Sequence, residues 1–231
     1  EEEMSGLGLG LGLGLGAHRI VDRYGNMPAT FTIPAGFANS GTKGINFSEP
    51  VTVTMTGGVT LSIGSTQYQS GDTIPVASSY HTLTINNPGE EAGTITFGKR
   101  KHITYLYLYN IGSSVITGDI TGMKLTYLRL NSIGSSVITG KITGMKLTYL
   151  YLYNIGSSVI TGDITGMELT TLYLYSLGSS VITGDITGMK LTYLYLYNIG
   201  SSVITGNITG MKLTFLRLYN IGSSVITGKI T

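Results

Sequence analysis

The tyrosines are the residues of this sequence whose type and spacing suggest chemistry. Of 16 tyrosines, 13 recur at three alternating positions of a 22-residue period. Tyrosine offers a large, rigid contact surface with a polar tip, which suits recognition of a protein or stacking on a sugar ring. The predicted binding residues, with two arginines at the same positions, are Tyr105, Tyr107, Tyr109, Tyr127, Arg129, Tyr149, Tyr151, Tyr153, Tyr173, Tyr175, Tyr193, Tyr195, Tyr197, Arg217 and Tyr219.

Self-stacking is the other interpretation of these columns. Rings that lie above one another on neighbouring strands would stabilise a sheet without any ligand. Arg129 lies between Tyr107 and Tyr151 in its column, and Arg217 adjoins Tyr195. Cation–π contacts can therefore account for both arginines in the absence of a partner.

Catalytic chemistry is not predicted. A variable column of alternating charge predicts only weak attraction between neighbouring units, up to about 1 kcal/mol; its members are Asp119, Lys141, Asp163, Asp185, Asn207 and Lys229. The histidines His18, His81 and His102 lack the spacing of a metal site and the partners of a nucleophile. A Ser-Ser pair recurs in every unit and predicts a turn ladder. We expect no enzyme activity, no metal and no cofactor.

Six near-identical 22-residue units, spanning residues 103–231, must position the tyrosines. Within each unit the leucines alternate with the outward positions, so that Leu128 and Leu130 face inward. One unit cannot bury its leucines alone, and stacked units about 4.8 Å apart would form a core of Leu, Ile, Val and Met columns. The sequence predicts a mainly β, right-handed solenoid with a parallel sheet and few helices. A three-sided parallel β-helix is the alternative.

The pattern L-x-x-L-x-L at Leu147, Leu150 and Leu152 resembles the strand signature of leucine-rich repeats. Residues 160–164, Ile-Thr-Gly-Asp-Ile, are similar to the convex-side segment of bacterial and phage-encoded examples. The resemblance covers the array and implies a solenoid whose strand face binds other macromolecules. Asn154 follows Leu152 by two residues, where the family has three, so the chain departs from the family at its buried asparagine ladder.

Three segments precede the array. Residues 1–17 alternate Gly and Leu and form either a strand with one leucine face or a flexible arm. Residues 18–79 predict a small β-rich head, in which Val51 to Met55, Gly57-Gly58 and Val59 to Ile63 predict a tight hairpin. Residues 80–102 match the repeat weakly and predict a degenerate capping coil.

Composition limits the partners. A net charge of +2 is too small for nucleic-acid binding, and the chain has no cysteine. The acidic N-terminus does not predict a signal peptide, and Leu7 to Leu15 is too short to span a bilayer. We expect an extracellular, cell-surface or virion-associated recognition or adhesion protein that binds protein or glycan. The alternative is a self-assembling fibre subunit that stacks end to end through the open C-terminal coil and the Gly-Leu arm.

Overall fold

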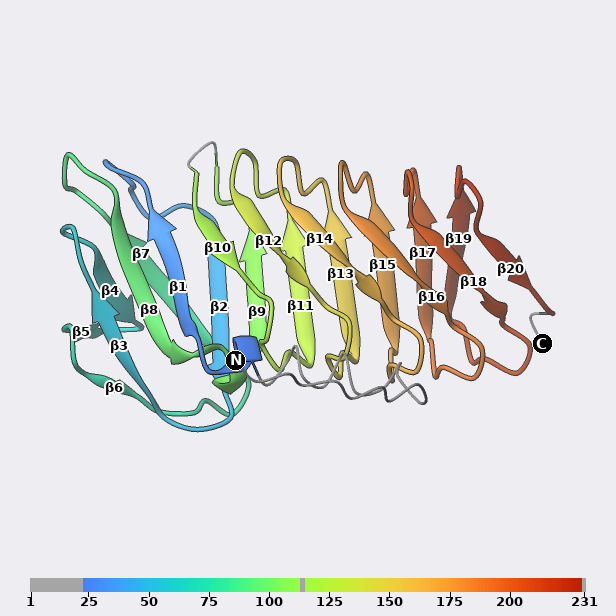
Figure 1. The fold of residues 1–231 in the computed structure, drawn as a ribbon, viewed down its shortest axis with the longest axis horizontal. Helices are drawn as coiled ribbons and strands as arrows, with labels where there is room; N and C mark the ends of the chain where they lie inside the picture. The colour runs from blue at the N-terminus through green and yellow to red at the C-terminus, as the bar shows by residue number, and fades with distance from the viewer. Residues whose placement is uncertain (1–22, 113–114, 230–231) are drawn as a thin grey trace, which may run out of the picture.

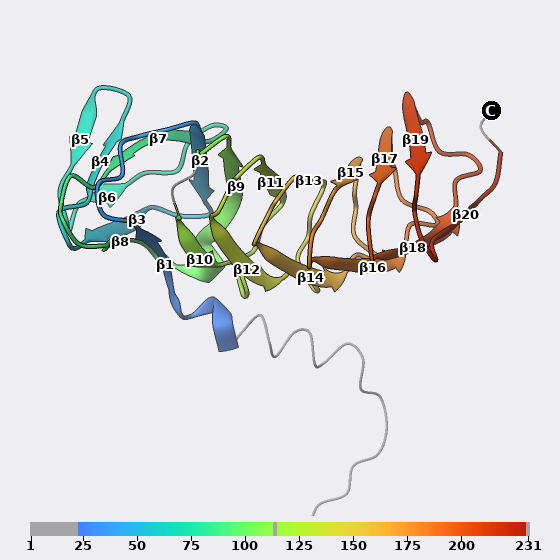
Figure 2. The same cartoon turned by 90° about the horizontal axis from the view of Figure 1, so that it is seen from above.

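The computed structural model describes residues 23–112 and 115–229. The chain forms two ten-stranded sheets that face each other along the whole molecule (Figures 1 and 2). Residues 103–112 and 115–229 wind as successive coils, and each coil contributes one strand to each sheet. The protein is therefore a β-solenoid of about six 22-residue turns, as predicted, with two strand-bearing sides instead of the three of the β-helix alternative.

We name the sheets after the residues on their outer faces. The tyrosine sheet contains, in spatial order, β19 (Phe215–Tyr219), β17 (Tyr193–Tyr197), β15 (Thr171–Tyr175), β13 (Tyr149–Tyr153), β11 (Tyr127–Asn131), β9 (Ile103–Tyr109), β2 (Thr42–Phe47), β7 (His81–Asn86), β4 (Thr60–Ile63) and β5 (Thr66–Tyr68). The valine sheet contains β20 (Val225–Thr227), β18 (Val203–Asn207), β16 (Val181–Asp185), β14 (Val159–Asp163), β12 (Val137–Lys141), β10 (Thr117–Asp119), β1 (Pro28–Ile33), β8 (Gly93–Lys99), β3 (Val51–Met55) and β6 (Thr73–Ile74). A short 3₁₀ helix, η1 (Arg100–His102), precedes β9.

Equivalent residues of successive coils are aligned in the tyrosine sheet. Leu128 pairs with Leu150, Leu150 with Leu172, and Leu172 with Leu194. All four leucines are fully buried. The predicted interior rows are thus confirmed, and each coil buries the leucines of the coil beside it.

The strands of the valine sheet are staggered by two residues per coil. Thr139 pairs with Val159, and Lys141 pairs with Thr161, so facing positions are 20 residues apart instead of 22. Figure 1 shows the result as the slanted course of β12 to β18. An even shift keeps each side chain on its face of the sheet, and it leaves Lys141 beside a threonine. The predicted attraction between Asp119, Lys141 and Asp163 was therefore wrong, because these residues are not lateral neighbours.

The valine column was expected in the core and lies outside it. Each valine precedes an inward isoleucine, such as the fully buried Ile138, and alternation turns the valine to the outer face. Val137 is only half-buried, and Val115 and Val225 are exposed. The other predicted columns, of Leu, Ile and Met, do form the interior.

A ladder of buried serines joins the coils at one corner. In the five described Ser-Ser pairs of the array the second serine is buried: Ser136, Ser158, Ser180, Ser202 and Ser224. Ser158 Oγ donates to the Ser136 carbonyl (2.9 Å) and accepts from the Ile138 amide (2.9 Å). Such paired donors and acceptors satisfy backbone groups that water cannot reach. The predicted turn ladder is confirmed.

The asparagine column serves the backbone. Asn110, Asn154, Asn198 and Asn220 have φ of 47–50°, as do Ser132 and Ser176 at the two remaining units (φ 48–50°). Asparagine tolerates this left-handed conformation better than most residues. The backbone N–H of Asn154 donates to the Tyr175 carbonyl (3.1 Å), so the turn continues the hydrogen bonding between coils.

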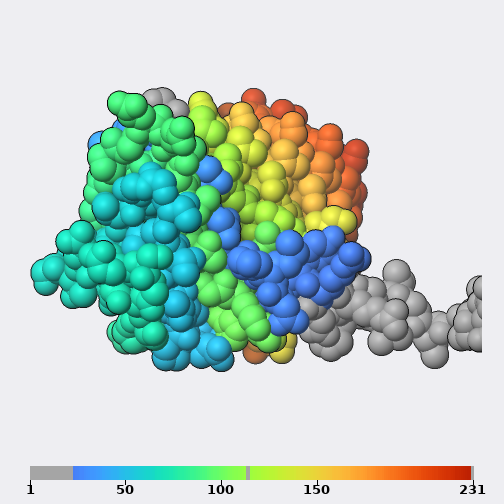
Figure 3. Space-filling model, turned by 60° about the vertical axis from the view of Figure 1, so that its left-hand side comes forward, coloured from blue at the N-terminus to red at the C-terminus, as the bar shows by residue number. Residues whose placement is uncertain are grey.

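The head covers one end of the array (Figure 3). It also shares both of the array's sheets. β1 pairs with β10 and β2 pairs with β9, both antiparallel. β7 and β8, which lie within residues 80–102, are separated from the first coil by these two strands. The capping role expected of residues 80–102 therefore falls to β1 and β2, which supply the antiparallel partners of the first coil.

The hairpin predicted across Gly57-Gly58 was wrong. β3 pairs with β6 and β8 in the valine sheet, whereas β4 pairs with β5 and β7 in the tyrosine sheet. Both glycines have positive φ, and the turn crosses from one sheet to the other. Val53 and Leu61, fully buried, then fill the same interior from opposite sides.

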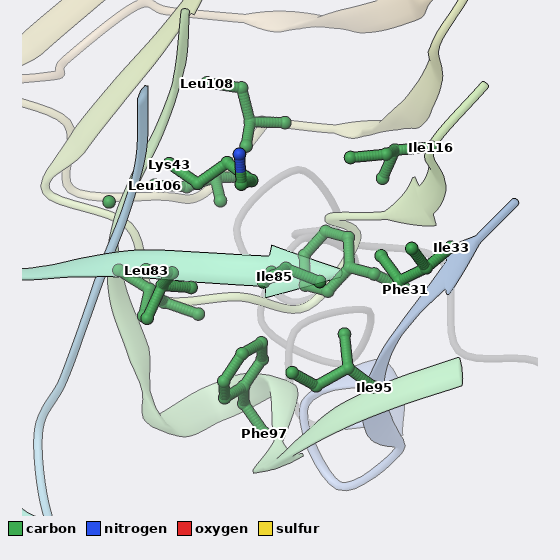
Figure 4. Close-up of a pocket in the computed structure, with 12 residues that line it drawn as sticks. Phe31, Ile33, Lys43, Leu83, Ile85, Ile95, Phe97, Leu106, Leu108 and Ile116 are labelled. Atoms are coloured by element: carbon green, nitrogen blue, oxygen red, sulfur yellow. The ribbon is translucent and has the colours of Figure 1, made fainter. Parts of the chain in front are cut away.

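A lysine is buried where the head meets the array. Lys43 on β2 is 1% exposed and pairs with Leu108 of β9. It lines a cavity of about 30 Å³ between the sheets, beside Leu106 and Leu108 (Figure 4). Its Nζ donates to the Ser40 carbonyl (2.6 Å) and lies 5.5 Å from the Phe37 ring centre. Burial lowers the pKa of Lys43 to about 8.

The glycine of the valine-sheet strands β12, β14, β16 and β18 should be required. A Cβ on Gly162 (φ 149°) would lie 2.8 Å from Ile142 Cγ1, whereas a Cβ on Gly166 (φ 76°) would meet no atom within 4 Å. We expect Gly162→Ala to lower the free energy of unfolding by about 2 to 4 kcal/mol, through overpacking added to backbone strain. Gly166→Ala, the matched control, should cost about 1 kcal/mol. Chemical denaturation measures both, and equal losses would contradict the role assigned to the Gly162 contact.

Stability should depend on the charge of Lys43. Because the folded-state pKa lies below the unfolded value, the unfolded chain binds more protons between pH 8 and the tyrosine range near pH 10. Stability should therefore rise with pH through this window in the wild type. Lys43→Met should be more stable at neutral pH and lack the rise. Thermal denaturation across the pH series measures this, and a parallel rise in the variant would sink the assignment to Lys43.

Candidate functional site

The tyrosine sheet brings all the predicted binding residues onto one face. In the first column the rings of Tyr105, Tyr127 and Tyr149 stack with centres 4.2–4.3 Å apart and planes within 11°. In the second column Tyr151, Tyr173 and Tyr195 stack at 4.1–4.2 Å. The third column stacks at 4.5–4.8 Å through Tyr153, Tyr175, Tyr197 and Tyr219. The in-register strands enforce this spacing.

Stacking occupies the faces of the rings. A ring such as Tyr173 has a neighbour on each side, Tyr151 at 4.1 Å and Tyr195 at 4.2 Å. A sugar ring cannot be inserted between them, because the gap is already at contact distance. The prediction that the tyrosines stack on one another is therefore confirmed. Most of the stacked tyrosines are half-buried on the sheet and can offer a partner their hydroxyls and ring edges, whereas Tyr195 is buried.

The two arginines belong to the same stack. The Arg129 guanidinium carbon lies 5.0 Å from the ring centre of Tyr107 and 4.6 Å from that of Tyr151. The Arg217 guanidinium carbon lies 5.5 Å from Tyr195 and 5.4 Å from Tyr197. The predicted cation–π contacts are confirmed. Neither arginine forms an ion pair with any residue in the described ranges.

The face continues onto the head through a residue that the repeat pattern could not reveal. Tyr80 stacks on Tyr105 with ring centres 4.7 Å apart and planes within 4°. Gly44 of β2 lies beneath the two rings, and a Cβ there would lie 2.9 Å from Tyr80 Cδ2. Gly44 was the sequence signal for this contact, because a glycine within a strand often marks a place where other groups approach the backbone.

Burial keeps the phenols neutral. It raises the pKa of Tyr105, Tyr149, Tyr151 and Tyr173 above the ordinary value. No strand of the tyrosine sheet contains Asp or Glu. The charge of the sheet's outer face over the array therefore comes from Arg129 and Arg217.

The charged residues and histidines that the sequence analysis considered make contacts that stabilise the fold. Asp163 Oδ1 accepts from the Thr165 amide (2.8 Å), which fixes a turn, and Asp119 forms an ion pair with Arg100 (2.7 Å). His102 Nδ1 lies 3.1 Å from a Glu49 carboxylate oxygen, and His81 Nε2 lies 2.6 Å from the Pro75 carbonyl oxygen. His18 and residues 1–17 lie outside the described residues. Within those described, no cluster of three or more potential metal ligands occurs, and no helix is long and apolar enough to cross a membrane.

The chain was compared with known proteins at three levels. No protein-family profile, no curated protein and no solved structure matches it. The site must therefore be interpreted from its own geometry.

Alkaline titration should show the buried stack directly. In the unfolded chain the phenols ionise near a pKa of about 10. In the folded chain Tyr105, Tyr149, Tyr151 and Tyr173 should remain un-ionised at higher pH, because burial raises the pKa of each. The stability they contribute should be present below pH 10 and lost as the pH rises further. Tyrosinate absorbance with and without denaturant measures both, and identical curves would contradict the burial of these phenols.

Proposed function

We propose that this protein is a non-enzymatic recognition protein that binds a protein partner through the tyrosine face. The observation that carries the proposal is the rigid array of three in-register columns, extended by Tyr80. Tyrosine provides contact area with little loss of conformational entropy on binding, and here stacking already restricts the side chains. Preorganisation of this kind favours affinity.

A protein partner fits the geometry better than a glycan. The case for a glycan depended on sugar rings stacking on tyrosine faces, and the interior rings have no free face. Hydroxyls, ring edges and two arginines are the groups that protein interfaces use most. Glycan binding remains an outcome of the test below.

We propose further that the array is leucine-rich-repeat-like and belongs to a cell-surface or virion-associated protein of bacterial or phage origin. Support comes from the L-x-x-L-x-L spacing, whose leucines form the buried rows of the tyrosine sheet. Residues 160–164, whose sequence resembles the convex-side segment of that family, lie mostly on β14 of the valine sheet. This part of the proposal rests on sequence likeness.

The alternative proposal is a self-assembling structural subunit. The specific feature in its favour is the outermost described coil, where β19 and β20 have one strand neighbour each. Their side chains include the exposed Phe215, Leu218 and Val225. Another copy of the chain could pair with these strands, as could further repeats.

Replacing Tyr151, Tyr173 and Tyr195 with Ser should abolish partner binding and leave the fold intact. The leucines beneath these residues remain in the core, so the fold should persist. The loss of stability should come from ring stacking, about 1 kcal/mol per pair, and from the lost burial of the three rings, above all of the buried Tyr195. A displayed peptide library and a glycan array, both probed with purified wild type and variant, measure binding. Circular dichroism and thermal melting report the fold.

The control changes Thr139, Thr161 and Thr183 of the valine sheet to Ser, which places the same residue at the same number of positions on the opposite face. We expect this variant to select the same peptides as the wild type. If the tyrosine variant selects the same peptides as the wild type, the proposal is wrong. If only glycans are captured, and the tyrosine variant loses that capture, the partner is a glycan and not a protein. Filaments in electron micrographs, unaffected by either variant, would favour the structural alternative.

A further inference from the structure

The acidic residues of the array lie away from the tyrosine sheet. Asp119, Asp163 and Asp185 lie on strands of the valine sheet, which also carries Lys141, and Glu168 lies between strands. The tyrosine sheet has no acidic residue on any strand, yet it presents Arg129 and Arg217 on its outer face. Two cations therefore stand on a surface that supplies no carboxylate of its own.

Arg129 is incompletely satisfied. Its side chain is half-buried between Tyr107 and Tyr151, and its Nε is enclosed without a hydrogen-bond partner among the described residues. Stacking compensates part of the desolvation of the guanidinium, but no anion neutralises its charge. Arg217, in the same column, is exposed and equally unpaired within the described residues.

The spacing of the two arginines is fixed by the fold. Arg129 pairs with Tyr151 and Tyr195 pairs with Arg217, so the arginines are four strands apart in one column. Four strand spacings of about 4.8 Å separate them by about 19 Å along the solenoid axis. An extended peptide advances about 3.3 Å per residue and covers this distance in about six residues. An even spacing also places both side chains on the same side of the peptide.

We infer that the partner is an acidic protein segment that lies along the axis of the tyrosine face and places two carboxylates, six residues apart, on Arg129 and Arg217. The inference rests on the proposed function and specifies its partner. Arg-carboxylate pairs are charge-assisted and can be bidentate, and the neutral phenols between the arginines contact the intervening residues. The positive face meeting a negative segment also favours fast, selective association.

Two synthetic peptides of identical composition test the spacing. Each carries two Glu in a Ser/Thr background, six residues apart in one and three apart in the other. We expect the wild type to bind the six-residue spacing at least tenfold more tightly, with an affinity that falls as salt is raised. No binding of either peptide, or equal binding of both, would overturn the inference.

The variant Arg129→Tyr/Arg217→Tyr removes both charges and installs the residue that the other units of this column carry, so the stack should persist. It should lose the preference for the six-residue spacing. As a matched control, Lys124→Gln/Lys146→Gln removes two exposed charges outside the face and should retain that preference. Loss of the preference in the lysine variant, or its retention in the arginine variant, would contradict the assignment.

Two further results distinguish a failure of this inference from a failure of the proposed function. If the arginine variant selects the same library peptides as the wild type, while the Tyr151, Tyr173 and Tyr195 variant selects none, the tyrosine face binds protein and the acidic partner is wrong. If polygalacturonate binds through the two arginines and neither peptide does, the acidic ligand is a glycan and the inference is overturned.

Discussion

The parallel register of the tyrosine sheet is the constraint on which the rest of the structure depends. Hydrogen bonds between neighbouring strands hold each residue opposite its equivalent 22 positions away. Because of this register, the inner face becomes continuous rows of leucine. The outer face becomes stacks of tyrosine, which Thr171 interrupts in the first column and Asn131 in the third, and which include two arginines in the second. The same backbone pairing therefore produces both the core and the candidate site.

The opposite sheet shows how a repeat can satisfy two different geometries. Its strands shift by two residues per coil, and Ile142 and Thr143 of the preceding coil then leave no space for a side chain at Gly162. The buried serines bridge the same offset, since Ser158 Oγ contacts the Ile138 amide 20 residues earlier. A repeated sequence can thus maintain register on one side and stagger on the other, provided that its small residues occur at the points of closest approach.

The head is part of the same two-sheet architecture. It continues both sheets with antiparallel strands, it covers the leucines of the first coil, and it carries the aromatic face onward through Tyr80. Lys43 is the exception to an apolar junction, because a buried amine there is stable only with a depressed pKa or with its charge partly compensated by Ser40 and Phe37.

The sequence by itself determined the repeat, the inward leucines and the outward tyrosines, because a period of 22 and alternation along a strand are local properties of the chain. It also predicted the serine turn ladder and the arginine–tyrosine stacking, since equivalent residues of stacked coils must be neighbours. Only the tertiary structure decided the stagger that separates Asp119 from Lys141, the outward position of the valines, the crossing of Gly57-Gly58 between sheets and the contact of Tyr80 with Tyr105. Each of these depends on which strands pair and with what offset, and pairing between distant segments is not written in the pattern of either segment alone.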